Sequence, residues 1–154
     1  MNDRRRTAWV HVVPAAVIVL AAVATVAASA QAAPWAAARL SVRTTEYGKA
    51  LFGPSGKVVY VFGADRGSTS HCYGACAKAW PVYYAKGGLT AGAGIKRSLL
   101  ATTKRRDGRR QVTYAGRPLY YYVGDTKPGQ IRCQKAAEFG GTWLIVRPSG
   151  RLVR

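Results

Sequence analysis

Acidic residues and histidine are scarce in this chain of 154 residues. It has six Asp and Glu against 24 Lys and Arg, and it has two histidines. His71 is the only histidine outside the apolar N-terminal segment. Because proton transfer in catalysis is performed most often by His, Asp or Glu, a single imidazole and few carboxylates indicate that the chain is not an enzyme. We also expect no cofactor.

A charge-free segment follows a basic N-terminus. Three arginines precede residues 7–38, which contain no Asp, Glu, Lys or Arg. Apolar residues are densest over 12–26, and small residues spaced two apart follow at 28–32, which is the order of parts in a secretory signal peptide. An uncleaved anchor is the alternative, because about 20 apolar residues span a bilayer. In either case residues 1–33 predict that the remainder is extracytoplasmic, secreted or tethered to the outer face of the cytoplasmic membrane.

The remainder of the chain is strongly basic. From residue 33 onward there are 21 Lys and Arg against five Asp and Glu, a net charge of +16. Such a charge attracts anionic surfaces and polymers. Outside the cytoplasm the candidate partners are an anionic envelope polymer or a membrane surface, with nucleic acid as a further candidate. A purely solubilising role is the alternative.

The densest group of cations surrounds one turn. The dipeptide Asp107-Gly108 lies between two β-type runs and predicts a hairpin. The hairpin cations are Lys104, Arg105, Arg106, Arg109 and Arg110. They are predicted to form an anion-binding finger, and a solvated hairpin tip is the alternative.

A ten-residue pattern occurs twice, sixty residues apart, at 56–65 and 116–125. Both copies contain Gly, a cation, a branched aliphatic residue, Tyr, an aromatic residue and Asp at the same positions. Two copies in a short chain indicate an internal duplication. Strand periodicity places the two aromatic residues of each copy on one face, and Asp follows at the strand's end, where it can hold a turn. The repeat-motif residues are Tyr60, Phe62, Asp65, Tyr120, Tyr122 and Asp125.

The rest of the chain consists of short β-type runs separated by glycines, and no long segment has helical periodicity. The sequence predicts an all-β, mainly antiparallel domain over 39–154, built from two related repeats at about 41–85 and 99–154. One short helical segment is expected within 72–80 and is ended by Pro81. The glycine-rich stretch 87–94 is expected to be a flexible loop.

These features resemble the secreted-repeat family of bacterial exported proteins and lipoproteins, which is marked by a Tyr-x4-Asp motif. The resemblance covers the two Tyr–Asp blocks and also the segments 72–77, 106–114 and 140–143. It implies tandem β-rich repeats in the cell envelope, with no established activity. The chain lacks the cysteine to which lipid is attached in lipoproteins of this family.

Three cysteines outside the cytoplasm cannot all pair within one molecule. The family resemblance favours a Cys72–Cys76 disulfide. The entropy of loop closure favours a bridge to Cys133 instead, at about 4 against about 2 kcal/mol. With the short bridge, Cys133 is either free or joined to a second molecule in a disulfide-linked dimer. The alternative function is a metal or small-ligand site formed by His71, Cys72 and Cys76, because imidazole and thiolates bind soft metals.

Overall fold

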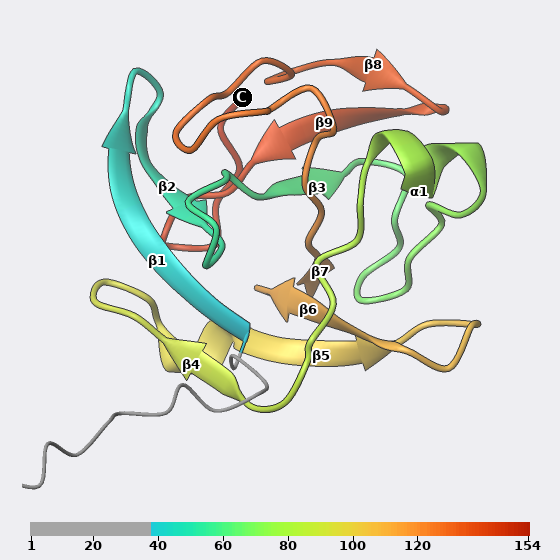
Figure 1. Cartoon of the computed structure of the whole chain (residues 1–154), viewed down its shortest axis with the longest axis horizontal. Helices are drawn as coiled ribbons and strands as arrows, with labels where there is room; N and C mark the ends of the chain where they lie inside the picture. The colour runs from blue at the N-terminus through green and yellow to red at the C-terminus, as the bar shows by residue number, and fades with distance from the viewer. Residues whose placement is uncertain (1–37) are drawn as a thin grey trace, which may run out of the picture. The chain divides into compact units, whose positions relative to one another are not determined.

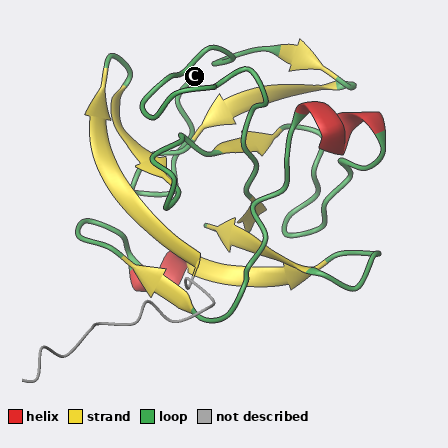
Figure 2. Ribbon diagram, viewed as in Figure 1, coloured by secondary structure: helices red, strands yellow, loops and turns green. Residues whose placement is uncertain are grey.

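The computed structural model describes residues 38–154. The predicted export segment, residues 1–33, lies outside the described residues. In chain order the elements are β1 (Ala38–Thr45), β2 (Gly48–Phe52), β3 (Tyr60–Phe62), α1 (Ala75–Ala79), β4 (Leu89–Ala91), a 3-10 turn (Arg97–Leu99), β5 (Leu100–Lys104), β6 (Arg110–Tyr114), β7 (Arg117–Pro118), β8 (Ala137–Glu138) and β9 (Gly141–Ile145). Strands dominate, as Figures 1 and 2 show, so the prediction of an all-β domain is confirmed. None of the helices in this part of the chain is long and apolar enough to cross a membrane.

Each repeat begins with an antiparallel hairpin. β1 pairs with β2 from Ser41↔Phe52 to Thr45↔Gly48, and β5 pairs with β6 from Leu100↔Tyr114 to Lys104↔Arg110. The predicted Asp107-Gly108 turn joins β5 to β6. Gly108 has a φ of 79°, a backbone conformation that glycine adopts without steric cost.

Two further expectations fall between the hairpins. The predicted helical segment is present as α1, a helix of five residues that ends before Pro81. The expectation that 87–94 is only a flexible loop is wrong, because Leu89–Ala91 forms β4, which pairs in parallel with β1 through Ala38↔Leu89 and Leu40↔Ala91. The partly buried Leu89 and Ala91 alternate with the exposed Thr90, a strand pattern that the flanking glycines obscure in the sequence.

The last strand of each repeat pairs with the other repeat. β9 lies antiparallel to β3, with Tyr60 opposite Ile145 and Phe62 opposite Trp143. The segment 79–83 pairs with 119–123 in the same way, because the Tyr121 amide donates to the Pro81 carbonyl at 2.8 Å and the Val123 amide donates to the Ala79 carbonyl at 3.0 Å. The β3–β9 pairing and the pairing of 79–83 with 119–123 therefore join the two repeats, whereas the β5-β6-β7 sheet lies within the second repeat.

Tyr60 and Tyr120 join these two pairs of strands. The amide of Tyr60 donates to the carbonyl of Tyr120 at 2.8 Å, and the amide of Tyr120 donates back at 2.9 Å. Tyr60 and Tyr120 occupy the same position of the two repeats, so this reciprocal pair lies at the centre of the contact between them.

Alternate residues of the central strands face two different cores. Tyr60, Phe62 and Tyr120 belong to one core, and Val59 and Val61 belong to the other. The first core also contains Trp80, Val82, Trp143 and Ile145; the second contains Leu40, Leu51, Val112, Tyr114 and Leu119. The prediction that the aromatic residues of each repeat share one face is confirmed. Two-sided burial explains why these strands have few polar residues.

The strand exchange makes a prediction about cleaved protein. A protease site inserted between the exposed Ala93 and Gly94 would cut the chain between the repeats. We expect the two fragments to elute together in gel filtration under native conditions and to separate only in denaturant, because each holds a strand of the other. Each isolated fragment should lose the near-ultraviolet circular dichroism that reports fixed aromatic packing. Fragments that separate freely while each keeps that signal would contradict the exchange; uncut protein treated with protease is the control.

Candidate functional site

The repeated Tyr and Asp bond to each other across the two repeats. The Tyr60 hydroxyl donates to Asp125 Oδ2 at 2.7 Å, and the Tyr120 hydroxyl donates to Asp65 Oδ2 at 2.8 Å. Hydrogen bonds to a charged group stabilise by about 1.5–3 kcal/mol each. These two bonds fasten the repeats together beside the central backbone pair.

The second oxygen of each carboxylate is bound within its own repeat. Asp65 Oδ1 accepts the His71 amide at 2.7 Å, and Asp125 Oδ1 accepts the Arg132 amide at 3.0 Å. The aspartates therefore do hold the chain that follows them, as the sequence suggested. The tyrosine partner in the other repeat was not anticipated. The duplication could have indicated it, because two copies that pack symmetrically against each other can pair the donor of one with the acceptor of the other.

Burial perturbs the acid–base behaviour of all four groups. It raises the pKa of Asp65 and of Asp125 above the usual range, although the N–H and O–H donors counteract this. Burial and the neighbouring carboxylates also raise the pKa of Tyr60 and Tyr120. The tyrosines stay protonated donors at every physiological pH. Because the folded pKa of the aspartates is raised, their contribution to stability is greatest in acid and declines as pH rises through that raised pKa.

Four aromatic rings form a column through the first core. Trp80 and Trp143 stack at 3.8 Å between centroids with planes 1° apart. Phe62 stacks on Trp143 at 4.3 Å, and Tyr122 covers Trp80 at 4.7 Å. Each aromatic pair contributes about 0.5–1.5 kcal/mol beyond its buried area. The column contains the matched aromatic residues of both repeats, so the positions Phe62 and Tyr122 are structural.

The column is symmetric in its rings and asymmetric in its polar contacts. The Trp80 indole N–H donates to Glu138 Oε2 at 2.9 Å. The buried indole N–H of Trp143 has no partner among residues 38–154. The second repeat thus supplies a carboxylate, Glu138, to the tryptophan of the first repeat. The first repeat supplies no such group to Trp143.

Cys72 and Cys76 form a disulfide, with Cα atoms 5.2 Å apart. This confirms the short bridge in place of the bridge to Cys133 that loop entropy favours, and Cys133 is left free. Cys133 follows Arg132 as Cys72 follows His71, so the two cysteines occupy matching positions of the two repeats. Cys133 is a half-buried free thiol.

The alternative metal site is wrong for this structure. Both sulfurs that were to bind metal are used in the disulfide, and residues 38–154 contain no group of three His, Cys, Asp or Glu placed to hold an ion. His71 is exposed, and its backbone amide, not its imidazole, makes the contact with Asp65.

Arg105 is not part of a solvent-facing cluster. Its side chain is buried, with the residue 4% exposed, and the guanidinium donates to Ser70 Oγ at 2.6 Å, to Gln111 Oε1 at 2.7 Å and to the Cys72 carbonyl at 2.7 Å. Ser70 in turn bonds to the Tyr120 hydroxyl at 2.7 Å, which joins Arg105 to the Tyr120–Asp65 pair. The prediction that Arg105 binds an external anion is therefore corrected. The neighbouring cations of the hairpin are similar in sequence. The local sequence therefore does not indicate that Arg105 is the one that contacts Ser70, 35 residues away.

The other hairpin cations are exposed, and we call Lys104, Arg106, Arg109 and Arg110 the tip cations. Arg106 lies over the Tyr73 ring at 4.1 Å, and Arg109 lies over the Tyr84 ring at 4.2 Å. Arg109 also pairs with Asp107 at 2.8 Å, which lowers the pKa of that carboxyl. Arg110 donates to Thr102 Oγ1. The tip thus has four cations and one acid, with two guanidinium groups stacked on aromatic rings.

A family model described as a secreted repeat of unknown function matches residues 41–83 and matches again at 101–147. The two matches correspond to the two structural repeats. No curated protein and no solved structure matches the chain significantly.

Double-mutant cycles would test the exchanged Tyr–Asp bonds. Combining Tyr60→Phe with Asp125→Ala, and Tyr120→Phe with Asp65→Ala, should give coupling energies of about 1.5–3 kcal/mol in denaturant unfolding. The pairs within one repeat, Tyr60 with Asp65 and Tyr120 with Asp125, should couple by less than about 0.5 kcal/mol.

Tyr47→Phe is the matched control for these cycles, because the Tyr47 ring is also packed against the first core. Its hydroxyl makes no hydrogen bond within residues 38–154, so the variant should unfold like the wild type. Stronger coupling within a repeat than between repeats would exclude the arrangement described here.

The role of Arg105 can be separated from that of its neighbours. Arg105→Ala should lower the free energy of unfolding by about 3 kcal/mol, because it removes a buried charge and leaves Ser70 and Gln111 without their donor. Arg109→Ala, in the same hairpin, should leave the denaturation midpoint nearly unchanged because its side chain is solvated. Equal effects of the two substitutions would show that Arg105 is not a structural anchor.

Proposed function

Because the chain belongs to the family of secreted repeats of unknown function, we propose that it is a non-enzymatic module of the cell envelope that associates with an anionic partner. The partner is an anionic envelope polymer or the anionic surface of the membrane. The family description supports an extracytoplasmic location. The apolar segment 7–33 supports either secretion or a tether at the outer face of the cytoplasmic membrane.

The observation that supports this proposal most directly is the charge balance at the tip of the β5–β6 hairpin. Within residues 38–154, the two ion pairs both use Asp107, one with Arg109 and one with the buried Arg105. Lys104, Arg106 and Arg110 have no carboxylate partner there. Their charges face solvent from a single turn and add to the net positive charge of the chain. Such a group of cations attracts a polyanion, such as a charged polymer or membrane surface, by long-range electrostatics.

The hairpin is held in place before any partner arrives. The buried guanidinium of Arg105 fastens the turn of the hairpin to Ser70 and Cys72, and the Arg106 amide donates to the Tyr73 hydroxyl at 3.2 Å. A fixed hairpin loses less conformational entropy on binding than a mobile one. Arg105 therefore contributes to binding by positioning the tip cations.

The absence of catalysis is part of the same proposal. Both oxygens of Asp65 and of Asp125 accept bonds from the protein, and the single imidazole of the described chain is exposed at His71 without a carboxylate bonded to its ring. The two carboxylates are arranged to hold the fold. Cys133 adds a proposal of its own, a disulfide-linked dimer, since the other two cysteines are paired with each other and its thiol is free of any disulfide.

A salt titration with matched variants tests the proposal. Binding of the full-length chain to anionic vesicles, to purified wall polymer and to DNA is measured from low to high salt. The affinity for the true partner should fall steeply, because the Debye length shrinks from about 10 Å at 0.1 M to about 3 Å at 1 M. The variant Arg106→Gln/Arg109→Gln/Arg110→Gln should lose about tenfold or more at low salt.

The control variant removes the same charge elsewhere. Lys49, Lys127 and Lys135 are exposed, and replacing all three with Gln lowers the net charge equally. This variant should retain most of the affinity. If both variants bind alike, the tip is only a solvated turn; if DNA is bound most tightly and the tip variant loses it, the partner is a nucleic acid and not an envelope component.

A further inference from the structure

A second group of cations lies at the opposite end of β6 from the hairpin tip. There the chain turns at Ala115–Gly116 into Arg117, beside a cavity of about 540 Å³. A second cavity of about 490 Å³ shares Arg117, Leu152 and Arg154 with the first and adds Arg151. Five strand residues separate this turn from the tip, or about 15 Å. The two surfaces can therefore be tested independently.

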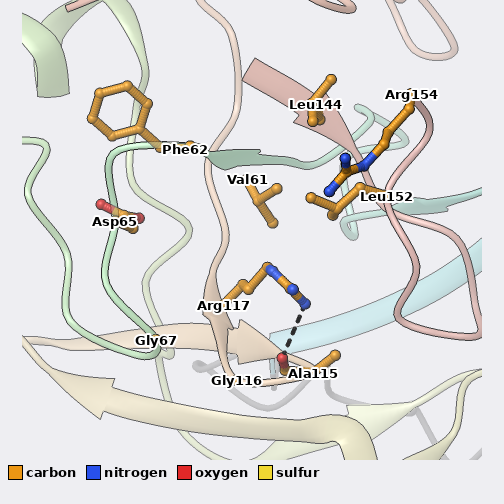
Figure 3. Close-up of a pocket in the computed structure, with 11 residues that line it drawn as sticks. Val61, Phe62, Asp65, Gly67, Ala115, Gly116, Arg117, Leu144, Leu152 and Arg154 are labelled. Carbon is orange, nitrogen blue, oxygen red and sulfur yellow. Dashed lines mark hydrogen bonds between the residues drawn. The ribbon is translucent and has the colours of Figure 1, made fainter. Parts of the chain in front are cut away.

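Arginine side chains stand beside an apolar surface in this cavity. Figure 3 shows the guanidinium groups of Arg117 and Arg154 extending toward it from two directions, with the side chains of Val61, Leu144 and Leu152 also in the lining. Leu144 and Leu152 are partly exposed and pack against the second core. The lining of the cavity thus combines two guanidinium groups with the hydrocarbon side chains of Val61, Leu144 and Leu152.

These arginines have no carboxylate partner within residues 38–154, where the ion pairs all involve Asp107. Arg117 makes one long bond of 3.4 Å to the Ala115 carbonyl. The acid that lines the cavity is Asp65, and both of its oxygens already accept bonds from His71 and Tyr120. Figure 3 places Asp65 on the far side of the cavity from Arg154. Two guanidinium groups that line one cavity, with no ion pair to either among residues 38–154, favour an anion between them.

We propose that the first cavity, which we call the arginine pocket (Arg117 and Arg154 beside Val61, Leu144 and Leu152), binds a phosphate monoester that carries an apolar group. Planar guanidinium groups bind phosphate oxygens in pairs, and several of them suit a group with more than one negative charge. The apolar side chains suit the organic group of the ester. The cavity volume is in the range of sites for small ligands, about 300–1,000 Å³. The phosphate lies between the guanidinium groups, away from Asp65, and the apolar group lies along Leu144 and Leu152.

Calorimetry with hexyl phosphate and inorganic phosphate tests the pocket. Hexyl phosphate should bind the purified full-length chain with saturation and several-fold more tightly than inorganic phosphate, because it also removes apolar surface from water. Arg117→Gln/Arg154→Gln should weaken hexyl phosphate about tenfold or more. The tip variant Arg106→Gln/Arg109→Gln/Arg110→Gln should bind it within about twofold of the wild type, because it leaves the pocket intact.

A second measurement keeps the test valid if the pocket variant folds poorly. In the wild type, hexyl phosphate should shift the methyl resonances of Leu144 and Leu152, whereas hexyltrimethylammonium, with the same chain and the opposite charge, should not. Equal affinity for hexyl phosphate and inorganic phosphate, unchanged binding in the pocket variant, or shifts with both amphiphiles would each overturn the proposal.

A lipid and a soluble phosphate ester share this chemistry, and vesicles distinguish them. If the source is a lipid, vesicles containing phosphatidic acid, a monoester, should bind the wild type more tightly than phosphatidylglycerol vesicles of equal charge, and the pocket variant should lose this difference. If the source is a soluble ester, hexyl phosphate should bind in the pocket while the two vesicles bind equally. Loss of tip-dependent binding without loss of hexyl phosphate binding would refute the proposed function alone.

Discussion

The structure depends on two hydrogen bonds between the repeats. In each bond, the tyrosine of one repeat donates to the aspartate of the other. Tyr60 to Asp125 and Tyr120 to Asp65 are short, buried or partly buried, and lie beside the backbone pair of the same two tyrosines. An unpaired buried carboxylate is costly, so removing either tyrosine leaves its partner repeat with an unsatisfied charge. The exchanged strands and the four-ring column likewise combine matching residues of the two repeats. The domain is therefore a single folding unit, even though its sequence consists of two repeats.

The two repeats differ where symmetry does not constrain them. Trp80 has Glu138 as an acceptor, and Trp143 has none among the described residues. Cys72 has Cys76 as its partner, and the matching Cys133 remains a thiol. The β1–β2 hairpin ends in a short turn closed by Thr45, whereas the β5–β6 hairpin ends in the cationic tip. Both surfaces to which we assign binding, the tip and the arginine pocket, include residues of the second repeat. The shared interior maintains the fold, and the unshared exterior supplies the differences on which function can depend.

Positive charge has three distinct uses in this molecule. Arg105 is buried and bonds to three acceptors, so it is structural. The tip cations are solvated and act at long range, in a manner that salt screens. Arg117 and Arg154 line a cavity together with apolar side chains, where we propose that an anion binds by direct contact. A net charge alone distinguishes none of these, because burial and neighbouring acceptors determine what a guanidinium can do.

The sequence by itself determined the class of fold, the duplication, the hairpin at Asp107-Gly108, the short helix before Pro81 and the face shared by Tyr60 and Phe62. These features depend on local periodicity and turn chemistry, which act over a few residues. The resemblance to a family indicated the Cys72–Cys76 bridge. Only the tertiary structure decided that Tyr60 bonds to Asp125, that Arg105 is buried, that 89–91 forms a strand and that Arg117 and Arg154 line one cavity. Each of these joins residues distant in the chain, and which of several similar side chains meets a given partner is decided by packing, since the residue types alone are equivalent.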